Sequence, residues 1–188
     1  MHTFPFAERF GLTARFMQMH SKWRRGMTPE DRQRVVGDFG QAARRAAAAG
    51  FDMLELHCAH GYLLSAFITP LMNQRSDEYG GCLENRLRFP LEVFRAVRRI
   101  WPDHKPMSVR ISANDWVGDA GVTPEDAVEI ARASWDAGAD LIVTVTTGSA
   151  ANVQRPWLKP GAFIARMGSY QEVTLDLLLE VDKLVVDR

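Results

Sequence analysis

The sequence has little cysteine, no excess of charge and no long apolar run. Its 188 residues include two cysteines, Cys58 and Cys82, which are too few for a disulfide framework and are not spaced as paired metal ligands. Basic and acidic residues number 23 each, so the formal net charge is zero and no long-range field draws the chain to nucleic acid or to an anionic membrane. These absences favour a reducing, cytoplasmic location and predict neither a nucleic-acid nor a membrane partner.

Charged residues interrupt the apolar N-terminal region, so we expect neither a signal peptide nor a membrane span there. Residues 1–26 have a helical periodicity instead. We predict a divergent N-terminal helical segment that packs on the body of the protein or on a partner, in preference to an organelle-targeting peptide.

One tetrapeptide occurs twice, as Thr28-Pro29-Glu30-Asp31 and as Thr123-Pro124-Glu125-Asp126. Threonine suits the N-cap of a helix, proline suits its first position, and the acidic residues complement the helix dipole. Each copy therefore predicts a helix, and these helices end near Gly50 and Gly138, which suit C-terminal caps.

Three apolar runs predict strands, and a helical pattern at Leu91, Phe94, Val97 and Ile100 precedes the second of them. The runs are Phe51–His57, Pro106–Ser112 and Ala139–Val145. Helices that alternate with strands across short connections predict an α/β fold, in which helical crossovers cover a parallel sheet.

The strand ends carry polar residues but no glycine-rich phosphate loop, which disfavours a dinucleotide-binding sheet. Polar groups at the carboxyl ends of strands are typical of a (β/α)8 TIM barrel. A complete barrel takes ~250 residues and eight strands, so three clear strands predict a partial or truncated barrel. We expect residues 62–90 to form a long excursion and residues 149–188 to form a divergent C-terminal loop and helix.

The candidate site follows the first predicted strand, where His57, His60 and Tyr62 lie close together in the sequence. Two imidazoles can donate hydrogen bonds to one substrate oxygen, and a phenol can supply a proton nearby. A structural role for this cluster stays open. So does a metal-dependent hydrolase in which His57, His60 and a carboxylate such as Asp115 bind the ion.

The segment from His57 to Leu64 (His-Cys-Ala-His-Gly-Tyr-Leu-Leu) resembles the old yellow enzyme family of flavin-dependent oxidoreductases. The resemblance continues at Phe67, Pro70, Asn73, Arg75, Asp77, Glu78, Tyr79, Gly80, Gly81, Glu84, Asn85 and Arg86. Val109–Ser112 and Ala139–Val143 are similar to the next two strands of the family. The similarity covers roughly residues 27–148, which we take as the flavin oxidoreductase portion of the chain.

The resemblance implies roles for four residues and for two cofactors. His57 and His60 would bind the carbonyl or nitro oxygen of an activated alkene, Tyr62 would be the proton donor, and Arg110 would contact the pyrimidine ring of FMN. The implied reaction is reduction of FMN by NAD(P)H, followed by hydride transfer to an α,β-unsaturated carbonyl compound. A histidine pair is similar to bacterial and 2,4-dienoyl-CoA-reductase-like members, so the expected substrate is a small unsaturated carbonyl or aromatic compound.

Two other expectations accompany this function. The family places cofactor contacts on strands that have no recognisable counterpart here, so the chain could instead be a catalytically silent half-barrel that acts as an assembly module, or one that a second copy or a partner chain completes. Arg110 could pair with Asp52 or Glu55 in the core. The polar residues of the excursion, among them Arg75, Asp77, Tyr79 and Arg86, are expected to hold that segment together.

Overall fold

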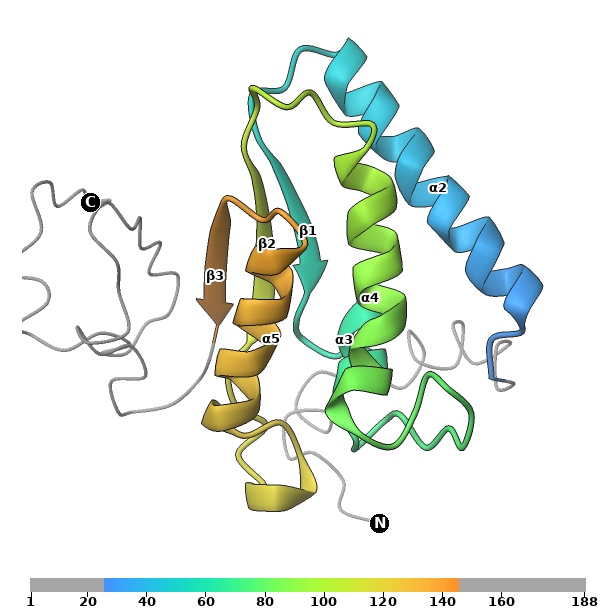
Figure 1. Cartoon of the computed structure of the whole chain (residues 1–188), viewed down its shortest axis with the longest axis vertical. Helices are drawn as coiled ribbons and strands as arrows, with labels where there is room; N and C mark the ends of the chain where they lie inside the picture. The colour runs from blue at the N-terminus through green and yellow to red at the C-terminus, as the bar shows by residue number, and fades with distance from the viewer. Residues whose placement is uncertain (1–25, 146–188) are drawn as a thin grey trace, which may run out of the picture. The chain divides into compact units, whose positions relative to one another are not determined.

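The computed structural model describes residues 26–145 (Figure 1). In chain order the elements are the helix α2 (Pro29–Ala48), the strand β1 (Leu54–Cys58), the helices α3 (Leu63–Ile68) and α4 (Leu83–Arg98), the strand β2 (Met107–Ser112), the short 3-10 helix η3 (Gly118–Ala120), the helix α5 (Pro124–Asp136) and the strand β3 (Leu141–Val145). The chain separates into two compact units, residues 1–32 and residues 33–188. The predicted segment 149–188 and nearly all of the segment 1–26 lie outside the described residues.

Both copies of the repeated tetrapeptide begin a helix, as predicted. In the first unit the amide of Asp31 donates to Thr28 Oγ1 over 3.2 Å, and the amide of Thr28 donates back to Asp31 Oδ2 over 3.0 Å. In the second unit Thr123 and Asp126 form the same capping box at the start of α5. Gly50 and Gly138 follow the two helices with φ angles of 83° and 102°, which suit glycine at a helix end.

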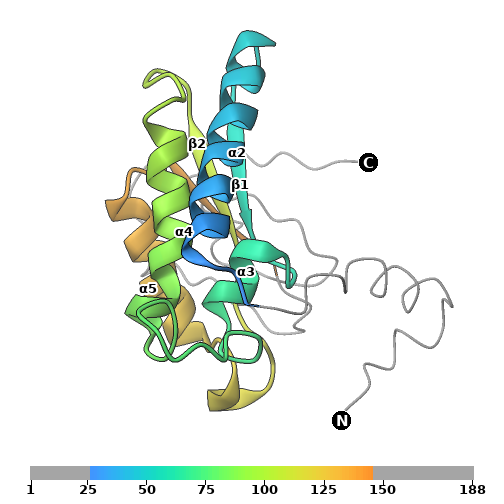
Figure 2. The same cartoon turned by 90° about the vertical axis from the view of Figure 1, so that its right-hand side faces the viewer.

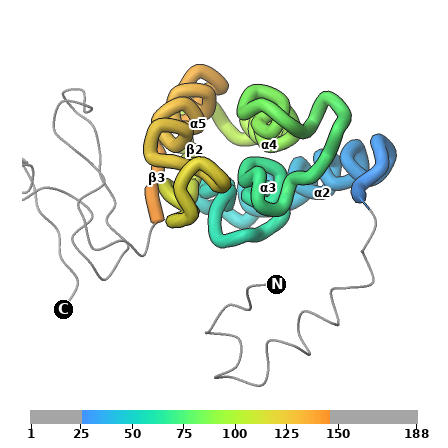
Figure 3. Tube along the Cα trace, turned by 90° about the horizontal axis from the view of Figure 1, so that it is seen from below, coloured from blue at the N-terminus to red at the C-terminus, as the bar shows by residue number. Residues whose placement is uncertain are grey.

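The described strands form a parallel sheet in the order β1-β2-β3. The helix α4 connects β1 to β2 and α5 connects β2 to β3. Figures 2 and 3 show α4 and α5 on one side of the sheet. The sequence therefore predicted the class and the topology of this portion, although β1, β2 and β3 begin at Leu54, Met107 and Leu141, slightly later than the apolar runs do.

The core lies between the sheet and the helices α4 and α5. Phe89, Val93 and Phe94 of α4 are at most 1% exposed, as are Met107 and Ile111 of β2. Burial of a large apolar side chain contributes about 1.5–3 kcal/mol, so this layer holds the sheet and its crossover helices together. In the same unit, a Cβ on Gly40 of α2 would lie 2.9 Å from Ile100 Cδ1, so this glycine permits a close approach of α2 to the segment after α4.

The excursion at residues 62–90 is more helical than the sequence predicted. The helix α3 lies within it, and α4 begins at Leu83 and continues through Pro90. Proline inside a helix removes a backbone hydrogen bond and disfavours the preceding turn. Here Phe89 and Pro90 are both buried, so packing on the core outweighs the local preference that places a helix start after the proline.

Within residues 26–145, every helix is too short or too polar to cross a membrane.

Candidate active site

On β1 and β2 the two faces of the sheet have opposite chemical character, because successive side chains along a strand alternate between faces. Leu56, Cys58, Val109 and Ile111 face the helices and are at most 4% exposed. Glu55 and His57 of β1 therefore lie on the opposite face, where they are paired in register with Ser108 and Arg110 of β2. The candidate site is built on this polar face and on the turn that follows β1.

His57, His60 and Tyr62 converge at the carboxyl end of β1. The ring centroids of His57 and His60 are 5.1 Å apart, and those of His57 and Tyr62 are 5.2 Å apart. The three side chains thus meet around His57, which the sheet fixes, while Tyr62 is 63% exposed. This is the arrangement that the sequence predicted, and the catalytic roles of the three residues stay predictions.

The turn between β1 and α3 gives the cluster its geometry. His60 has a φ angle of 60° and Gly61 one of 71°, both in the left-handed region. The amide of His60 donates to Ser112 Oγ over 3.1 Å, and the amide of Gly61 donates to Ser65 Oγ over 3.3 Å. The reversal brings His60 and Tyr62 back beside His57.

The pKa of His57 is lowered from its ordinary value of 6.5, first because partial burial disfavours the charged ring. The neighbouring charges of His60 and Arg110 lower it further, and Glu55 opposes them. His57 is therefore a neutral imidazole at neutral pH. A neutral ring has one N–H to donate, which suits a hydrogen bond to an oxygen that gathers negative charge.

Arg110 lies beside His57 and forms an ion pair with Glu55. Its Nε donates to Glu55 Oε1 over 2.7 Å, and the two side chains are 20% and 31% exposed. The sequence left open whether Arg110 contacts a flavin or pairs with an acidic residue, and the structure shows the pair with Glu55. This bond uses Nε, and a guanidinium has further N–H donors on its two terminal nitrogens, so the pairing does not exclude a second contact.

The excursion is held by hydrogen bonds from polar side chains, as predicted. Arg86 Nε donates to the carbonyl of Ile68 over 2.7 Å, and Nη1 donates to the carbonyl of Gly81 over 2.6 Å. Arg75 forms an ion pair with Asp77. A Cβ on Gly80 would lie 2.1 Å from the carbonyl oxygen of Arg75, so this position requires glycine.

The structure does not support a metal site formed by His57, His60 and Asp115. Asp115 Oδ2 accepts hydrogen bonds from Thr69 Oγ1 over 2.5 Å and from the amide of Val122 over 2.9 Å, so this carboxylate joins two loops. Among residues 26–145 the structure contains no group of three or more histidine, cysteine, aspartate or glutamate side chains that could hold a metal ion. The hypothesis of a hydrolase whose metal ion is bound by His57, His60 and Asp115 is therefore wrong.

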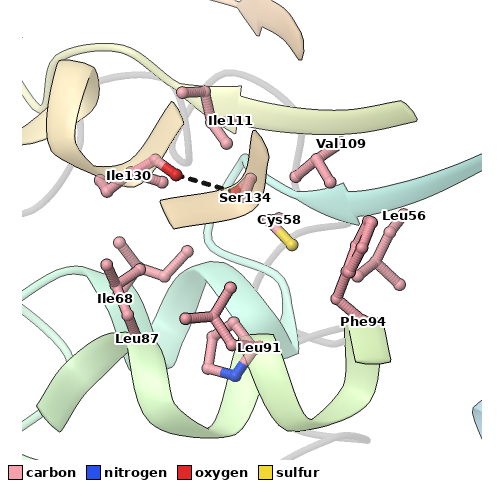
Figure 4. Close-up of a pocket in the computed structure, with 11 residues that line it drawn as sticks. Leu56, Cys58, Ile68, Leu87, Leu91, Phe94, Val109, Ile111, Ile130 and Ser134 are labelled. Carbon is pink, nitrogen blue, oxygen red and sulfur yellow. Dashed lines mark hydrogen bonds between the residues drawn. The ribbon is translucent and has the colours of Figure 1, made fainter. Parts of the chain in front are cut away.

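A small cavity lies on the opposite, apolar face of the sheet (Figure 4). Its lining includes Leu56 and Cys58 of β1, Phe94 of α4 and Ile130 of α5. Its volume of about 10 Å³ is at the lower limit for one water molecule, and its lining is almost entirely apolar. Because its walls belong to the core, we regard it as a packing gap between sheet and helices.

Sequence reasoning missed the contributions of Ser65 and Ser112. Ser112 belongs to one of the polar strand ends, but serine is common at strand ends and helix starts, so the sequence singled out neither residue as part of the site. A left-handed His60 could not be foreseen either, because local sequence does not require it. The useful signal is the position of Ser112 at the end of the strand next to β1, which only a paired register identifies.

Comparison with known proteins gives a family match over most of the chain. The model of the NADH:flavin oxidoreductase / NADH oxidase family matches residues 6–174. This range is wider than residues 27–148, where the motifs indicated a resemblance. It includes the strands β1, β2 and β3 and all four candidate site residues.

The curated relatives are considerably longer proteins. An NADPH dehydrogenase from Clostridium acetobutylicum is 48% identical over 111 residues, which are 59% of this chain and 33% of the relative. An NADPH dehydrogenase from Bacillus subtilis is 45% identical over 116 residues, or 62% of this chain and 33% of the relative. The chain thus spans about a third of the length of these curated relatives.

Solved structures resemble the fold over a similar range. An old yellow enzyme homologue from Zymomonas mobilis has a TM-score of 0.59 and 30% identity, and the match covers 68% of this chain and 36% of that one. A 2-naphthoyl-CoA reductase in complex with 2-naphthoyl-CoA has a TM-score of 0.67 and 28% identity, and the match covers 82% of this chain and 26% of that one. These matches confirm the predicted partial (β/α)8 barrel and the resemblance to old yellow enzymes. With a family model that matches residues 6–174, the chain belongs to the NADH:flavin oxidoreductase / NADH oxidase family, which is a family of flavin-dependent enzymes.

Proposed function

We propose that this chain is an FMN-dependent oxidoreductase that uses NAD(P)H to reduce activated alkenes, chiefly α,β-unsaturated carbonyl compounds. The observation that carries the proposal is the convergence of three side chains: the ring centroid of His57 lies 5.1 Å from that of His60 and 5.2 Å from that of Tyr62. Family membership supports the cofactors.

The histidine pair is suited to binding the oxygen of an unsaturated carbonyl group. Reduction of the alkene turns that oxygen into an enolate oxygen, which accepts hydrogen bonds more strongly than the carbonyl does. One preorganised donor at such an oxygen is typically worth ~3 kcal/mol of barrier. His57 and His60 lie close enough for each ring to donate one N–H to a shared oxygen.

Tyr62 is suited to the proton transfer that completes the reduction. Its ring is next to His57 and largely exposed, so its hydroxyl is accessible to a bound substrate. A phenol is neutral at neutral pH and can protonate the strongly basic α-carbon of an enolate. We therefore assign the donated proton to the Tyr62 hydroxyl.

The face of β1 and β2 that carries His57 and Arg110 offers hydrogen-bond donors that suit the rim of a flavin ring. The rim of an isoalloxazine carries carbonyl oxygens and ring nitrogens that accept hydrogen bonds, and Arg110 and His57 present donors on one face. When FMN is bound, it supplies the hydride chemistry, taking a hydride from NAD(P)H and passing one to the alkene. Arg110 would hold the electron-rich end of the ring and favour its anionic reduced form through its positive charge.

The proposed substrates are small molecules with a carbonyl group conjugated to a double bond or an aromatic ring. The solved neighbour that carries 2-naphthoyl-CoA agrees with this class, since its ligand has a carbonyl attached to an aromatic ring. Cytoplasmic location and the completion of the barrel by a second copy or a partner chain stay predictions from the sequence.

A flavin titration of the full chain tests the proposal. We expect bound FMN, oxidation of NADPH that depends on an added alkene such as 2-cyclohexen-1-one, and loss of the alkene-dependent reaction in the His57→Ala, His60→Ala double variant. A chain that folds but binds no FMN would instead favour the silent half-barrel. That alternative predicts an oligomer in sizing chromatography without absorbance at flavin wavelengths.

A further inference from the structure

The turn that carries His60 is held at two consecutive amides. His60 N–H donates to Ser112 Oγ over 3.1 Å and Gly61 N–H donates to Ser65 Oγ over 3.3 Å. His60 has a side chain and a φ angle of 60°, a combination that is unfavourable for an L-residue. Such a conformation persists only where its surroundings hold it.

The outer side of this turn is exposed, so side-chain packing does not hold it there. His60, Gly61 and Tyr62 are all exposed. On the strand side the turn is fixed by Ala59, which is fully buried. The reversal that follows Ala59 is therefore fixed by the hydrogen bonds at these two amides together with the bond from the Tyr62 amide to the Ala59 carbonyl, over 3.3 Å.

Of the two serines that accept these amide hydrogen bonds, Ser112 is the one that is distant from the turn in the sequence. It is the last residue of β2, which has β1 on one side and β3 on the other, so its position is set by the middle strand of the described sheet. Ser65 lies in the short helix α3, which begins directly after the same turn. Ser112 thus ties His60 to the rigid part of the fold.

We propose that Ser112 is a positioning residue of the site. Its hydroxyl accepts the His60 amide hydrogen bond and thereby holds the His60 ring beside His57, where both rings can donate to one oxygen. The part of this inference that concerns the oxygen rests on the proposed function. The part that concerns the placement of His60 does not.

The variants Ser112→Thr and Ser112→Val form a matched pair, because their side chains have nearly the same shape and differ in the hydroxyl group. In the full chain without added flavin, NMR measures hydrogen exchange at the His60 amide. We expect exchange to be roughly three- to tenfold faster in Ser112→Val, as for the loss of one hydrogen bond, and near the native rate in Ser112→Thr. Equal rates in the two variants would overturn the anchor.

A second measurement follows the ring itself. The His60 ring contributes to the lowered pKa of His57, together with partial burial and Arg110, while Glu55 opposes them. Arg110 and Glu55 are fixed on their strands, so loss of the His60 contribution alone should raise the His57 pKa toward 6.5 in Ser112→Val and leave it unchanged in Ser112→Thr. A His57 pKa that is the same in both variants would show that the ring does not depend on Ser112.

The third measurement separates positioning from a general structural role. In flavin-loaded protein, 4-nitrophenol serves as a mimic of the enolate oxygen, and we expect its Kd to rise about tenfold in Ser112→Val while the Kd of FMN stays unchanged. Parallel weakening of FMN and phenol binding would overturn the positioning role. Ser134→Ala is the control, because it removes a buried hydroxyl on α5 that donates to the Ile130 carbonyl, remote from the site.

Failure of the proposed function gives a different pattern. Native protein that binds FMN but no phenol would contradict the proposed oxygen site. Hydrogen exchange at the His60 amide and the pKa of His57 would then still show whether Ser112 positions His60.

Discussion

His57 on β1 and Arg110 on β2 are partners in the parallel ladder, so their side chains leave the sheet on the same face. The guanidinium is bonded to Glu55, and its charge helps to keep the neighbouring imidazole neutral. A neutral hydrogen-bond donor thus lies beside a cation on one polar surface. This pairing joins the proposed oxygen site to the proposed flavin side of the site.

Removal of both imidazoles should abolish the oxygen site. In the double variant His57→Ala, His60→Ala, we expect phenol binding to flavin-loaded protein to fall by at least two orders of magnitude, since each donor is worth ~3 kcal/mol. The long-wavelength charge-transfer absorbance of the complex measures it. Persistence of that band in the double variant would refute the oxygen-binding role, provided that Tyr62→Phe, the control, leaves the band in place.

The substitution Tyr62→Phe removes the proton donor and keeps the ring. We expect alkene reduction to slow by about 10²- to 10⁴-fold, the usual contribution of a positioned general acid. Reduction of the flavin by NAD(P)H should be unaffected, because it requires no proton from Tyr62. Stopped-flow absorbance separates the two half-reactions, and an equal loss in both would contradict the assignment.

Stability should fall as the solution becomes acidic, in part because of His57. Its pKa in the folded chain is lowered from 6.5, so as the pH falls below that value the unfolded chain takes up a proton before the folded chain does. The contribution is fully present above pH 6.5 and is lost as the pH falls toward the folded pKa. Urea denaturation on either side of pH 6.5 should show a smaller pH effect in His57→Gln than in the native chain. An identical pH effect in both proteins would rule out this linkage.

The two cysteines should differ in reactivity. Burial raises the pKa of the Cys58 thiol to about 12, whereas Cys82 is exposed. Because the thiolate is the reactive form, native protein should react with one equivalent of a disulfide reagent near neutral pH. Unfolded protein should react with two, and native Cys82→Ser protein with none. Fast labelling of native Cys82→Ser would show that the β1 core is open.

The capping box of α5 should contribute measurably to stability. Thr123→Ala removes the side-chain oxygen that accepts from the Asp126 amide over 3.2 Å. The expected loss is about 1 kcal/mol in the free energy of unfolding, measured by urea denaturation. Thr123→Ser keeps the acceptor and should stay close to the native value, so a similar loss in both variants would indicate another cause.

Much of the fold could be predicted locally. The repeated tetrapeptide indicates helix starts because threonine accepts a hydrogen bond from a free amide there, proline suits the first helical position and acidic residues complement the helix dipole. The start of α4 was missed because Pro90 suggests a boundary, whereas burial of Phe89 and Pro90 on the core extends the helix past it. Likewise the metal hypothesis used Asp115, whose carboxylate the structure places on Thr69 and Val122.

The sequence alone determined the alternation of helices and strands, and from it the parallel arrangement of the strands. It also placed His57, His60 and Tyr62 at the end of β1. Helix caps, apolar periodicity and polar residues at a strand end are local properties of the sequence, which is why they could be read from it. The tertiary structure decided which partners these groups have. Arg110 meets Glu55 and His60 meets Ser112 across 55 and 52 residues of chain, respectively. Such contacts depend on strand register and on a left-handed turn, and both are fixed only when separate segments pack together.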